Sequence, residues 1–327
     1  MKDKINMRKL AILLLCISFI ACEKNNETIG TEPTPLSLEQ QLGSYPSISL
    51  FTEAIAICED TLNASPNEIT LFAPTNAVLN QFLSDAGVSS FSELKENIGT
   101  EFYRAWLGSH FFPSALRLEQ MQTAYIPSLA YNPLGQQIHT YSQREKTILA
   151  INGQYINLLA KDIQIPAGIL HISRQKMQVP TITKLISANG NSFSILKRAL
   201  QMSNNSLASM LNRDDKMFTI FAPNDAAFDQ YFQDKRCSDL DGFIEMFGGA
   251  ALEDLLMQHI SLGSYDISSL NGQSIKSLQA DKDLNIFLSA GNLMVSNNAG
   301  SEANIVHTDI TAFNGRVQLI DKVLKLP

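Results

Sequence analysis

The strongest constraint on the fold of this chain is an internal duplication. Residues 70–83 have the sequence TLFAPTNAVLNQFL, and residues 219–232 have the sequence TIFAPNDAAFDQYF, at an offset of 149. The same offset carries His110 onto His259 without a gap. Similarity maintained over so long a stretch indicates that one structural unit occurs twice.

The length of the chain agrees with a tandem arrangement. A chain of 327 residues is long for a single domain and comfortable for two. Its apolar fraction of 45% indicates that both copies can bury a core. We expect one domain at residues 37–179 and a second at residues 180–327, with the join near Pro180, because proline is common in linkers.

Within each repeat the sequence pattern changes from helical to extended. Apolar residues ahead of the repeated block recur at helical spacing, among them Leu50, Phe51, Ala54, Ile55 and Cys58. In the second half of each repeat, short apolar runs bounded by Asn, Gly and Pro predict strands, for example at residues 147–152 and 284–288. Residues 168–172 and 316–326 predict the closing strands. Helices followed by strands predict the α+β class.

The repeated block itself predicts a strand followed by a helix. Its apolar start ends at Pro74 in one copy and at Pro223 in the other, and proline cannot donate a hydrogen bond to a sheet. The pairs Thr75/Asn76 and Asn224/Asp225 follow directly, and the side-chain oxygens of these residue types suit a helix N-cap. We therefore expect an N-cap at each pair, with Asn76 or Asp225 capping a helix.

The N-terminal segment resembles a bacterial lipoprotein signal. Basic residues precede the apolar run Leu10–Ile20, which is shorter than the about 20 residues that a membrane-spanning helix needs. The following FIAC motif resembles a lipobox, although Phe19 stands where Leu is usual. The resemblance implies that residues 1–21 are removed and that Cys22 is lipidated. The alternative is an ordinary secretory signal with a cysteine there by chance.

The residues after Cys22 predict a tether. Residues 22–36 are polar, contain two prolines and show no apolar periodicity. We therefore expect a lipid-anchored protein of the cell envelope, held at the outer membrane and facing either the surface or the periplasm.

Charge and motif content argue against several functions. The formal net charge is −7, and cleavage of the signal segment would remove four basic residues and one acidic residue, which makes the charge more negative. A negative surface repels phosphate backbones, so nucleic acid is not an expected partner. No nucleophile elbow, P-loop or dinucleotide-binding loop is present, and no histidine lies four residues from another. We expect no catalytic site, no metal and no cofactor.

The cysteines do not form a disulfide framework. Beyond Cys22, only Cys58 and Cys237 remain, one in each repeat. A bridge between them would require the two domains to pack face to face, and a small core residue is the simpler interpretation of Cys58.

Three ordered features in each repeat resemble the fasciclin family. The first is the strand–proline–helix block, and the second is a histidine that closes the helical half, His110 or His259. The third is the C-terminal strand, FNGRVQLIDKVLKLP at residues 313–327 and PAGILHISRQKMQVP at residues 166–180. Gln318 replaces the usual His in the second copy, and the first copy keeps His171 but lacks the Asp.

This resemblance implies two tandem fasciclin-like domains, each a wedge or sandwich of β-strands packed with a helical layer. It implies structural roles for the motif residues: Pro74, Asn76, His110, His171, Pro223, Asp225, His259, Gly315 and Asp321. We expect the three histidines to form hydrogen bonds inside the fold. It also implies a role in adhesion or matrix binding without an active site.

Loops rich in tyrosine provide the candidate ligand contacts. Tyr125, Tyr131 and Tyr141 lie in turn-rich segments, and tyrosine is a frequent contact residue for proteins and glycans. The first functional hypothesis is a non-catalytic, membrane-anchored adhesion or matrix-binding protein. The alternative is an accessory lipoprotein of an outer-membrane uptake system that captures a glycan or another solute. In both cases we expect the membrane and an extracellular protein or glycan as partners.

Overall fold

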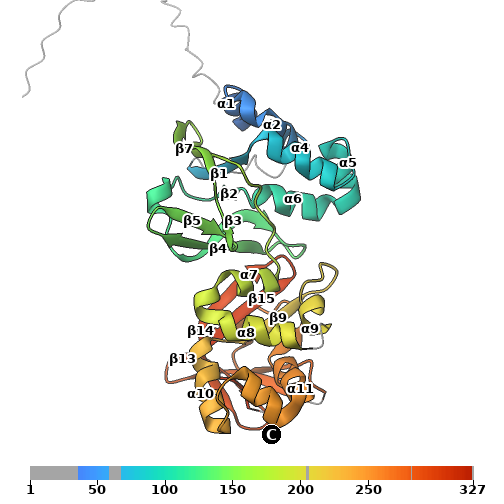
Figure 1. The fold of residues 1–327 in the computed structure, drawn as a ribbon, viewed down its shortest axis with the longest axis vertical. Coiled ribbons are helices and arrows are strands. Elements are labelled where there is room, and N and C mark those ends of the chain that lie inside the picture. The colour runs from blue at the N-terminus through green and yellow to red at the C-terminus, as the bar shows by residue number, and fades with distance from the viewer. Residues whose placement is uncertain (1–35, 59–67, 204–205, 281, 326–327) are drawn as a thin grey trace, which may run out of the picture. The chain divides into compact units, whose positions relative to one another are not determined.

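The computed structural model describes residues 36–58, 68–203, 206–280 and 282–325 (Figure 1). Ser37–Pro327 forms one compact unit, separate from Met1–Leu36. The predicted signal segment, Cys22 and nearly all of the predicted tether lie outside the described residues. None of the described helices is long and apolar enough to span a membrane.

The first repeat begins with helices and continues with strands. Its helices are α1 (Leu38–Leu42), α2 (Ser49–Ala56), α4 (Asn76–Asp85), α5 (Phe91–Ile98) and α6 (Thr100–Gly108). Its strands are β1 (Ile69–Pro74), β2 (Phe111–Phe112), β3 (Ala124–Tyr131), β4 (Gln137–Glu145), β5 (Ile148–Ile151), β6 (Gln154–Tyr155), β7 (Leu158–Ile165) and β8 (Gly168–Ser173). A single strand, β1, lies between the helices, as the repeated block predicts.

The second repeat follows the same order. Its helices are α7 (Ile182–Ala188), α8 (Gly190–Met202), α9 (Ser206–Met210), α10 (Asp225–Lys235) and α11 (Leu240–Gln258). Its strands are β9 (Phe218–Pro223), β10 (Ile260–Leu262), β11 (Gln273–Lys276), β12 (Asp283–Ser289), β13 (Asn292–Asn297), β14 (Glu302–Ala312) and β15 (Gly315–Ile320). Helix α11 bends at Gly248, where φ is 82°, and Gly99 has the same φ between α5 and α6.

The sheets of the two repeats have equivalent strand orders. The second repeat has one seven-stranded sheet, in the order β10-β9-β15-β14-β13-β12-β11. The first repeat divides the equivalent strands between two four-stranded sheets, β2-β1-β8-β7 and β3-β4-β5-β6. In each case the strand of the repeated block pairs in parallel with the C-terminal strand, β1 with β8 and β9 with β15. These four strands are buried along their whole length, which explains their nearly continuous apolar sequence.

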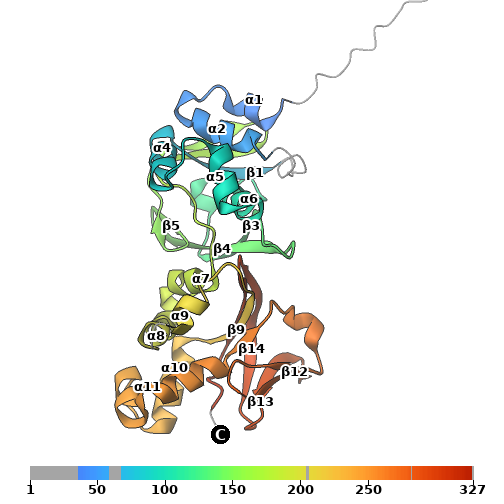
Figure 2. The ribbon, with the colours of Figure 1, turned by 90° about the vertical axis from the view of Figure 1, so that its right-hand side faces the viewer.

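In each repeat the main core lies between the helices and the strands, and a second core lies among the strands. Figure 2 shows the helices of the second repeat on one side and its strands on the other. The main core of the first repeat contains Cys58, and that of the second contains Cys237. Both thiols are buried and free, so the bridge considered above is not formed. The fold belongs to the predicted α+β class.

A small apolar cluster joins the two repeats within the compact unit. Phe313, at the turn between β14 and β15, packs with Ala105, Ala130 and Ile138 of the first repeat. Its ring also meets that of Phe102 edge-on, with 5.1 Å between centroids. The cluster shows that residues distant in sequence meet at the join.

Two predicted boundaries differ from the structure. The closing strand of the second repeat, predicted for residues 316–326, ends at Ile320. Asp321 and Lys322 form a bend there, and the chain then leaves the sheet. The strand of the repeated block begins one residue before the block, at Ile69, which pairs with Gly168, and it includes Pro74, which pairs with Ser173.

Candidate functional site

Two buried histidines hold the ends of the repeats in the same way. His110 follows α6, and its Nδ1 donates to the carbonyl oxygen of Trp106 at 2.9 Å. Its Nε2 accepts from the backbone N–H of Met177 at 3.0 Å. This pair of partners assigns the proton to Nδ1. The ring therefore joins the end of a helix to the segment that follows the C-terminal strand.

His259 makes the equivalent contacts in the second repeat. Its Nδ1 donates to the carbonyl oxygen of Leu255 at 2.7 Å, and its Nε2 accepts from the N–H of Leu324 at 2.9 Å. Both rings are inaccessible to a ligand, and both ring nitrogens are already used. The prediction that these histidines form hydrogen bonds inside the fold agrees with this geometry, which suits a structural role.

Burial keeps both imidazole rings neutral. It lowers the pKa of His110 to about 3 and that of His259 to about 4, because charging a ring without access to water is unfavourable. The hydrogen bonds to Trp106 and Leu255 oppose this effect only in part. A proton on Nε2 would also remove the acceptor for the N–H of Met177 or Leu324.

Mild acid is therefore expected to destabilise the protein. An unfolded histidine titrates near about pH 6.5, so the unfolded chain binds these protons before the folded chain does. The contribution of the neutral rings to the free energy of unfolding is complete above about pH 6.5 and is lost as the pH falls toward about 4. Between these pH values we expect the free energy of unfolding to fall by up to about 1.4 kcal/mol per pH unit for each of the two histidines. Urea unfolding from about pH 7 to about pH 5 would measure this slope, and a flat profile would contradict the assignment.

His171 and Gln318 perform the same task in the two closing strands. Nδ1 of His171 accepts from the N–H of Asp162 at 3.2 Å, and Oε1 of Gln318 accepts from the N–H of Asp309 at 2.7 Å. Both aspartates have a φ of 57° and lie where the strand pairing shifts register. Gln318 therefore supplies the acceptor that the sequence pattern assigns to a histidine, and the departure from that pattern leaves the backbone contact intact.

Asn76 and Asp225 each accept hydrogen bonds at the N-terminal end of a helix other than the one that they begin. Oδ1 of Asn76 accepts from the N–H of Leu50 at 3.0 Å, at the start of α2. The carboxylate of Asp225 accepts from the N–H groups of Ser194 and Ile195, at 3.1 and 2.8 Å. Both contacts satisfy free N–H groups where helical turns begin, at the start of α2 and just after the kink at Phe193 in α8.

The helices that begin at Asn76 and Asp225 differ in their own caps. The N-cap of α4 is Thr75, which makes no side-chain cap hydrogen bond. The N-cap of α10 is Asn224, whose side chain accepts from the N–H of Ala227 at 2.8 Å. The local sequence pattern therefore predicts the N-cap positions, Thr75 and Asn224, correctly. It does not show that the next residue, Asn76 or Asp225, bonds to a different helix.

The remaining motif residues shape the backbone of the sheet. Pro74 and Pro223 are the last residues of β1 and β9. Gly315 begins β15 with a φ of 141°, a conformation that other residues rarely adopt. Asp321 accepts from the backbone and side-chain nitrogens of Asn304, at 2.8 and 2.7 Å, and so holds the turn after β15 against β14.

The three candidate tyrosines do not form one surface. Tyr125 and Tyr141 pack against each other with 4.9 Å between ring centroids, and burial raises the pKa of both. The hydroxyl of Tyr125 accepts from Nδ2 of Asn189 in the second repeat at 3.2 Å. Tyr131, at the end of β3, is 48% exposed. Of the three, Tyr131 is the one whose ring is open to a ligand.

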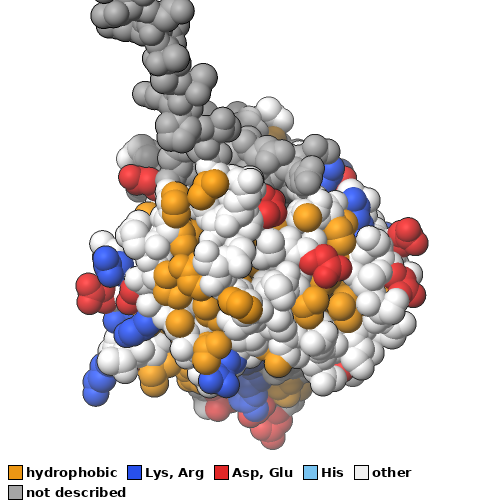
Figure 3. Space-filling model, turned by 90° about the horizontal axis from the view of Figure 1, so that it is seen from above, with side chains coloured by type: hydrophobic (Ala, Val, Ile, Leu, Met, Phe, Trp, Pro, Cys, Tyr) orange, Lys and Arg blue, Asp and Glu red, His pale blue; other side chains and the backbone are white. Residues whose placement is uncertain are grey.

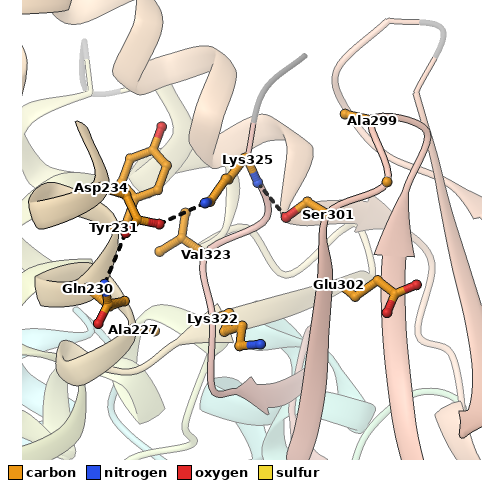
Figure 4. A pocket seen from close by; sticks show the side chains of 11 residues that line it. Ala227, Gln230, Tyr231, Asp234, Ala299, Ser301, Glu302, Lys322, Val323 and Lys325 are labelled. Atoms are coloured by element: carbon orange, nitrogen blue, oxygen red, sulfur yellow. Dashed lines mark hydrogen bonds and ion pairs between the residues drawn. The ribbon is translucent and has the colours of Figure 1, made fainter.

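A cavity of about 600 Å³ lies between α10, the turn from β13 to β14, and the segment after β15 (Figure 4). Nζ of Lys325 lies 2.7 Å from Oδ2 of Asp234, and Gln230 donates to the same carboxylate. The backbone N–H of Lys325 donates to Oγ of Ser301 at 3.0 Å. Two of the four charged residues that line this cavity, Lys325 and Asp234, therefore satisfy each other and hold the C-terminal segment in place, while Glu302 and Lys322 also line it.

The described residues offer no clear site for ion chemistry. They contain no group of three His, Cys, Asp or Glu side chains placed to hold a metal ion. On the face shown in Figure 3, Lys and Arg side chains are interspersed with Asp and Glu. Such a mixture does not offer a continuous basic track to a phosphate backbone.

Several buried side chains have no hydrogen-bond partner in the described part of the chain, namely Trp106, Thr140, Ser142 and Gln258. Both amide atoms of Gln258 are buried and unpaired, although the neighbouring His259 is fully bonded. In the first repeat the equivalent residue, Ser109, donates to the carbonyl oxygen of Ala105 at 2.7 Å. At this position the hydroxyl of Ser109 therefore finds an acceptor in its own helix, whereas the amide of Gln258 finds no partner.

Comparisons with known proteins agree with this geometry. Residues 191–327 match the family model of the fasciclin domain. A search of curated proteins finds no match. Among solved structures, the chain is similar to a FAS1 domain pair from the insect cell adhesion molecule fasciclin I, with a TM-score of 0.51 and 17% sequence identity. This similarity covers 86% of the present chain and 98% of the other. Residues 191–327 are therefore similar to a fasciclin domain, and the fold of the chain is that of two tandem fasciclin-like α+β domains.

Proposed function

We propose that this protein is a non-catalytic lipoprotein of the cell envelope that adheres to or binds external material through its fasciclin fold. The observation that carries the proposal is that the motif side chains form hydrogen bonds inside the fold. His110, His259, Asn76 and Asp225 have side chains committed to hydrogen bonds within the fold. They maintain a scaffold, and a scaffold of this kind leaves its outer surface for binding.

The comparison with fasciclin I supports adhesion as the form of binding. That protein is an insect cell adhesion molecule, and its domain pair shares the fold of this chain. Two linked binding modules also gain avidity, because the second contact forms at a high effective concentration. Adhesion through two weak surfaces does not require a deep active site.

Adhesion can be tested with intact bacterial cells that carry the full chain. Attachment to surfaces coated with matrix proteins, polysaccharides or the protein itself would be counted under flow. Cells with the chain are expected to attach more strongly than cells without it, and added soluble protein should compete. Equal attachment with and without the chain on all coatings would overturn the adhesion proposal.

The anchor is a separate part of the proposal and rests on the FIAC motif at residues 19–22. Each buried methylene of an attached lipid contributes about 0.8 kcal/mol, so several chains hold a protein firmly at a membrane. We expect Cys22→Ser to move the protein from the membrane fraction to the soluble fraction in a Gram-negative host. Cys16→Ser, six residues earlier in the predicted signal segment, is the matched control and should leave fractionation unchanged. Membrane retention of the Cys22→Ser protein would exclude a lipid on this cysteine.

A further inference from the structure

Two adjoining cavities lie on the helical side of the second repeat, near its join with the first. One, of about 310 Å³, is lined by residues of α7, α8 and α9, and the other, of about 360 Å³, by residues of α7 and of the segment before it. Thr183, Ser187 and Asn212 line both, and we call the combined feature the α7 groove. Figures 1 and 2 show α7, α8 and α9 together in this part of the repeat. Each cavity reaches the lower end of the ~300–1,000 Å³ range of ligand pockets.

Hydroxyl and amide groups are prominent in the lining of the α7 groove, and several of their donors remain unused. The hydroxyl groups of Thr181 and Thr183 both donate to Oδ1 of Asn212, at 2.9 and 3.0 Å. These two bonds fix the amide and occupy its oxygen. Nδ2 of Asn212 and the hydroxyl groups of Ser187 and Ser209 have no hydrogen-bond partner among the described residues. The groove therefore offers a set of neutral donors, of which the amide of Asn212 is held in place.

Lys184 and Lys197 carry the only charges among the residues that line the α7 groove. Lys184 is half-buried, Lys197 is exposed, and neither ammonium group has an ion-pair partner in the described part of the chain. No Asp or Glu of the described residues lines either cavity, although the whole chain has a net charge of −7. A purely positive groove on an acidic protein favours an anionic ligand.

The lining also contains apolar surface and lacks aromatic rings. Ile186, Leu200, Ala208 and Val179 contribute aliphatic side chains. Without an aromatic side chain, the groove has no platform for stacking nucleic-acid bases. No strand borders it, so a peptide could not extend a sheet there. Aliphatic patches beside hydroxyl, amide and ammonium donors suit a ring that carries C–H groups, hydroxyl groups and an acid.

We propose that the α7 groove binds a segment of acidic polysaccharide. Lys184 and Lys197 would pair with its acid groups, and Asn212, Ser187 and Ser209 would donate to its hydroxyl and ring oxygens. This inference rests on the proposed binding function and names the chemical class of the ligand. The two adjoining cavities are occupied by neighbouring sugar units of one chain.

The test compares one acidic probe with its neutral counterpart. Calorimetry would measure the binding of polygalacturonate, in which each sugar carries a carboxylate, to the detergent-solubilised full-length protein. Fully methyl-esterified polygalacturonate has the same backbone without the charge and should not bind. The double variant Lys184→Ala/Lys197→Ala is expected to bind polygalacturonate about tenfold more weakly, a change of about 1.4 kcal/mol. Lys322→Ala, an exposed lysine of the same repeat outside the groove, is the matched control and should bind normally.

The remaining outcomes separate this site from the adhesion proposal. Unchanged affinity in the double variant, equal binding of the methyl ester, or tighter binding of polyglutamate than of polygalacturonate would each overturn the polysaccharide site. Asn212→Asp gives an independent check, because it replaces a donor with a negative charge and should also weaken binding. If the groove binds polygalacturonate but cells do not attach to any coating, the site stands and adhesion fails. If cells attach and the groove variants bind normally, adhesion stands and the site fails.

Discussion

Gly315→Ala is expected to destabilise the second repeat by about 4 kcal/mol or more, which is among the largest effects of a single substitution. A Cβ on Gly315 would lie 1.8 Å from the carbonyl oxygen and 2.7 Å from the nitrogen of Phe218. Both atoms belong to the backbone of β9, which pairs with β15 at this point. Relief would require β9 and β15 to separate, and the φ of 141° would strain alanine even with more space.

Urea unfolding of the purified protein would measure this loss, and limited proteolysis would show whether the second repeat folds at all. Gly249→Ala is the matched control, because no atom beyond its own helical backbone lies within 4 Å of its added Cβ and the residue is within helix α11. Alanine there should be neutral or stabilise by about 0.5–1 kcal/mol, since glycine is the more flexible residue when unfolded. A Gly315→Ala protein as stable as the wild type would mean that β9 and β15 do not approach as closely as described.

His259→Ala is expected to lower the free energy of unfolding by about 3 kcal/mol. The substitution leaves the buried N–H of Leu324 and the carbonyl oxygen of Leu255 without their ring partners, and each unsatisfied group costs about 1–3 kcal/mol. It also leaves a cavity at a position that is 2% exposed, which adds to the cost. Because the imidazole is neutral in the fold, salt should have little influence on this loss.

The local signature of this variant is the release of the segment after β15. Hydrogen exchange at the amide of Leu324 should accelerate before the rest of the repeat opens, because this amide donates to the His259 ring. His307→Ala is the matched control: this residue is exposed, and its loss should change stability by less than about 0.5 kcal/mol. If both variants were equally stable, the ring would not hold the C-terminal segment.

Features within a short stretch of sequence could be predicted with success. The duplicated block predicts a strand, a proline stop and a helix, and β1 with α4 and β9 with α10 follow that order. The change from helical to alternating patterns predicts the α+β class. These predictions succeed because period and turn chemistry depend on neighbouring residues, which a sequence displays directly.

Contacts between distant residues required the tertiary structure. Asn76 and Asp225 lie at helix starts, yet their oxygens reach N–H groups 26 and 30 residues earlier in the chain. Gln318 departs from the expected histidine, yet it supplies the same acceptor to the backbone. Tyr125, a candidate surface contact, is instead turned against Tyr141 and Asn189.

The sequence alone therefore determined the duplication, the order of elements and the class of fold, because these follow from local periodicity and from a repeated pattern. The tertiary structure decided which polar groups are satisfied inside and which remain available. The two histidine contacts and the α7 groove depend on side chains that meet only after the helices and strands have packed. Hydrogen bonding and burial at such meeting points are properties of three-dimensional position, and no spacing along the chain encodes them directly.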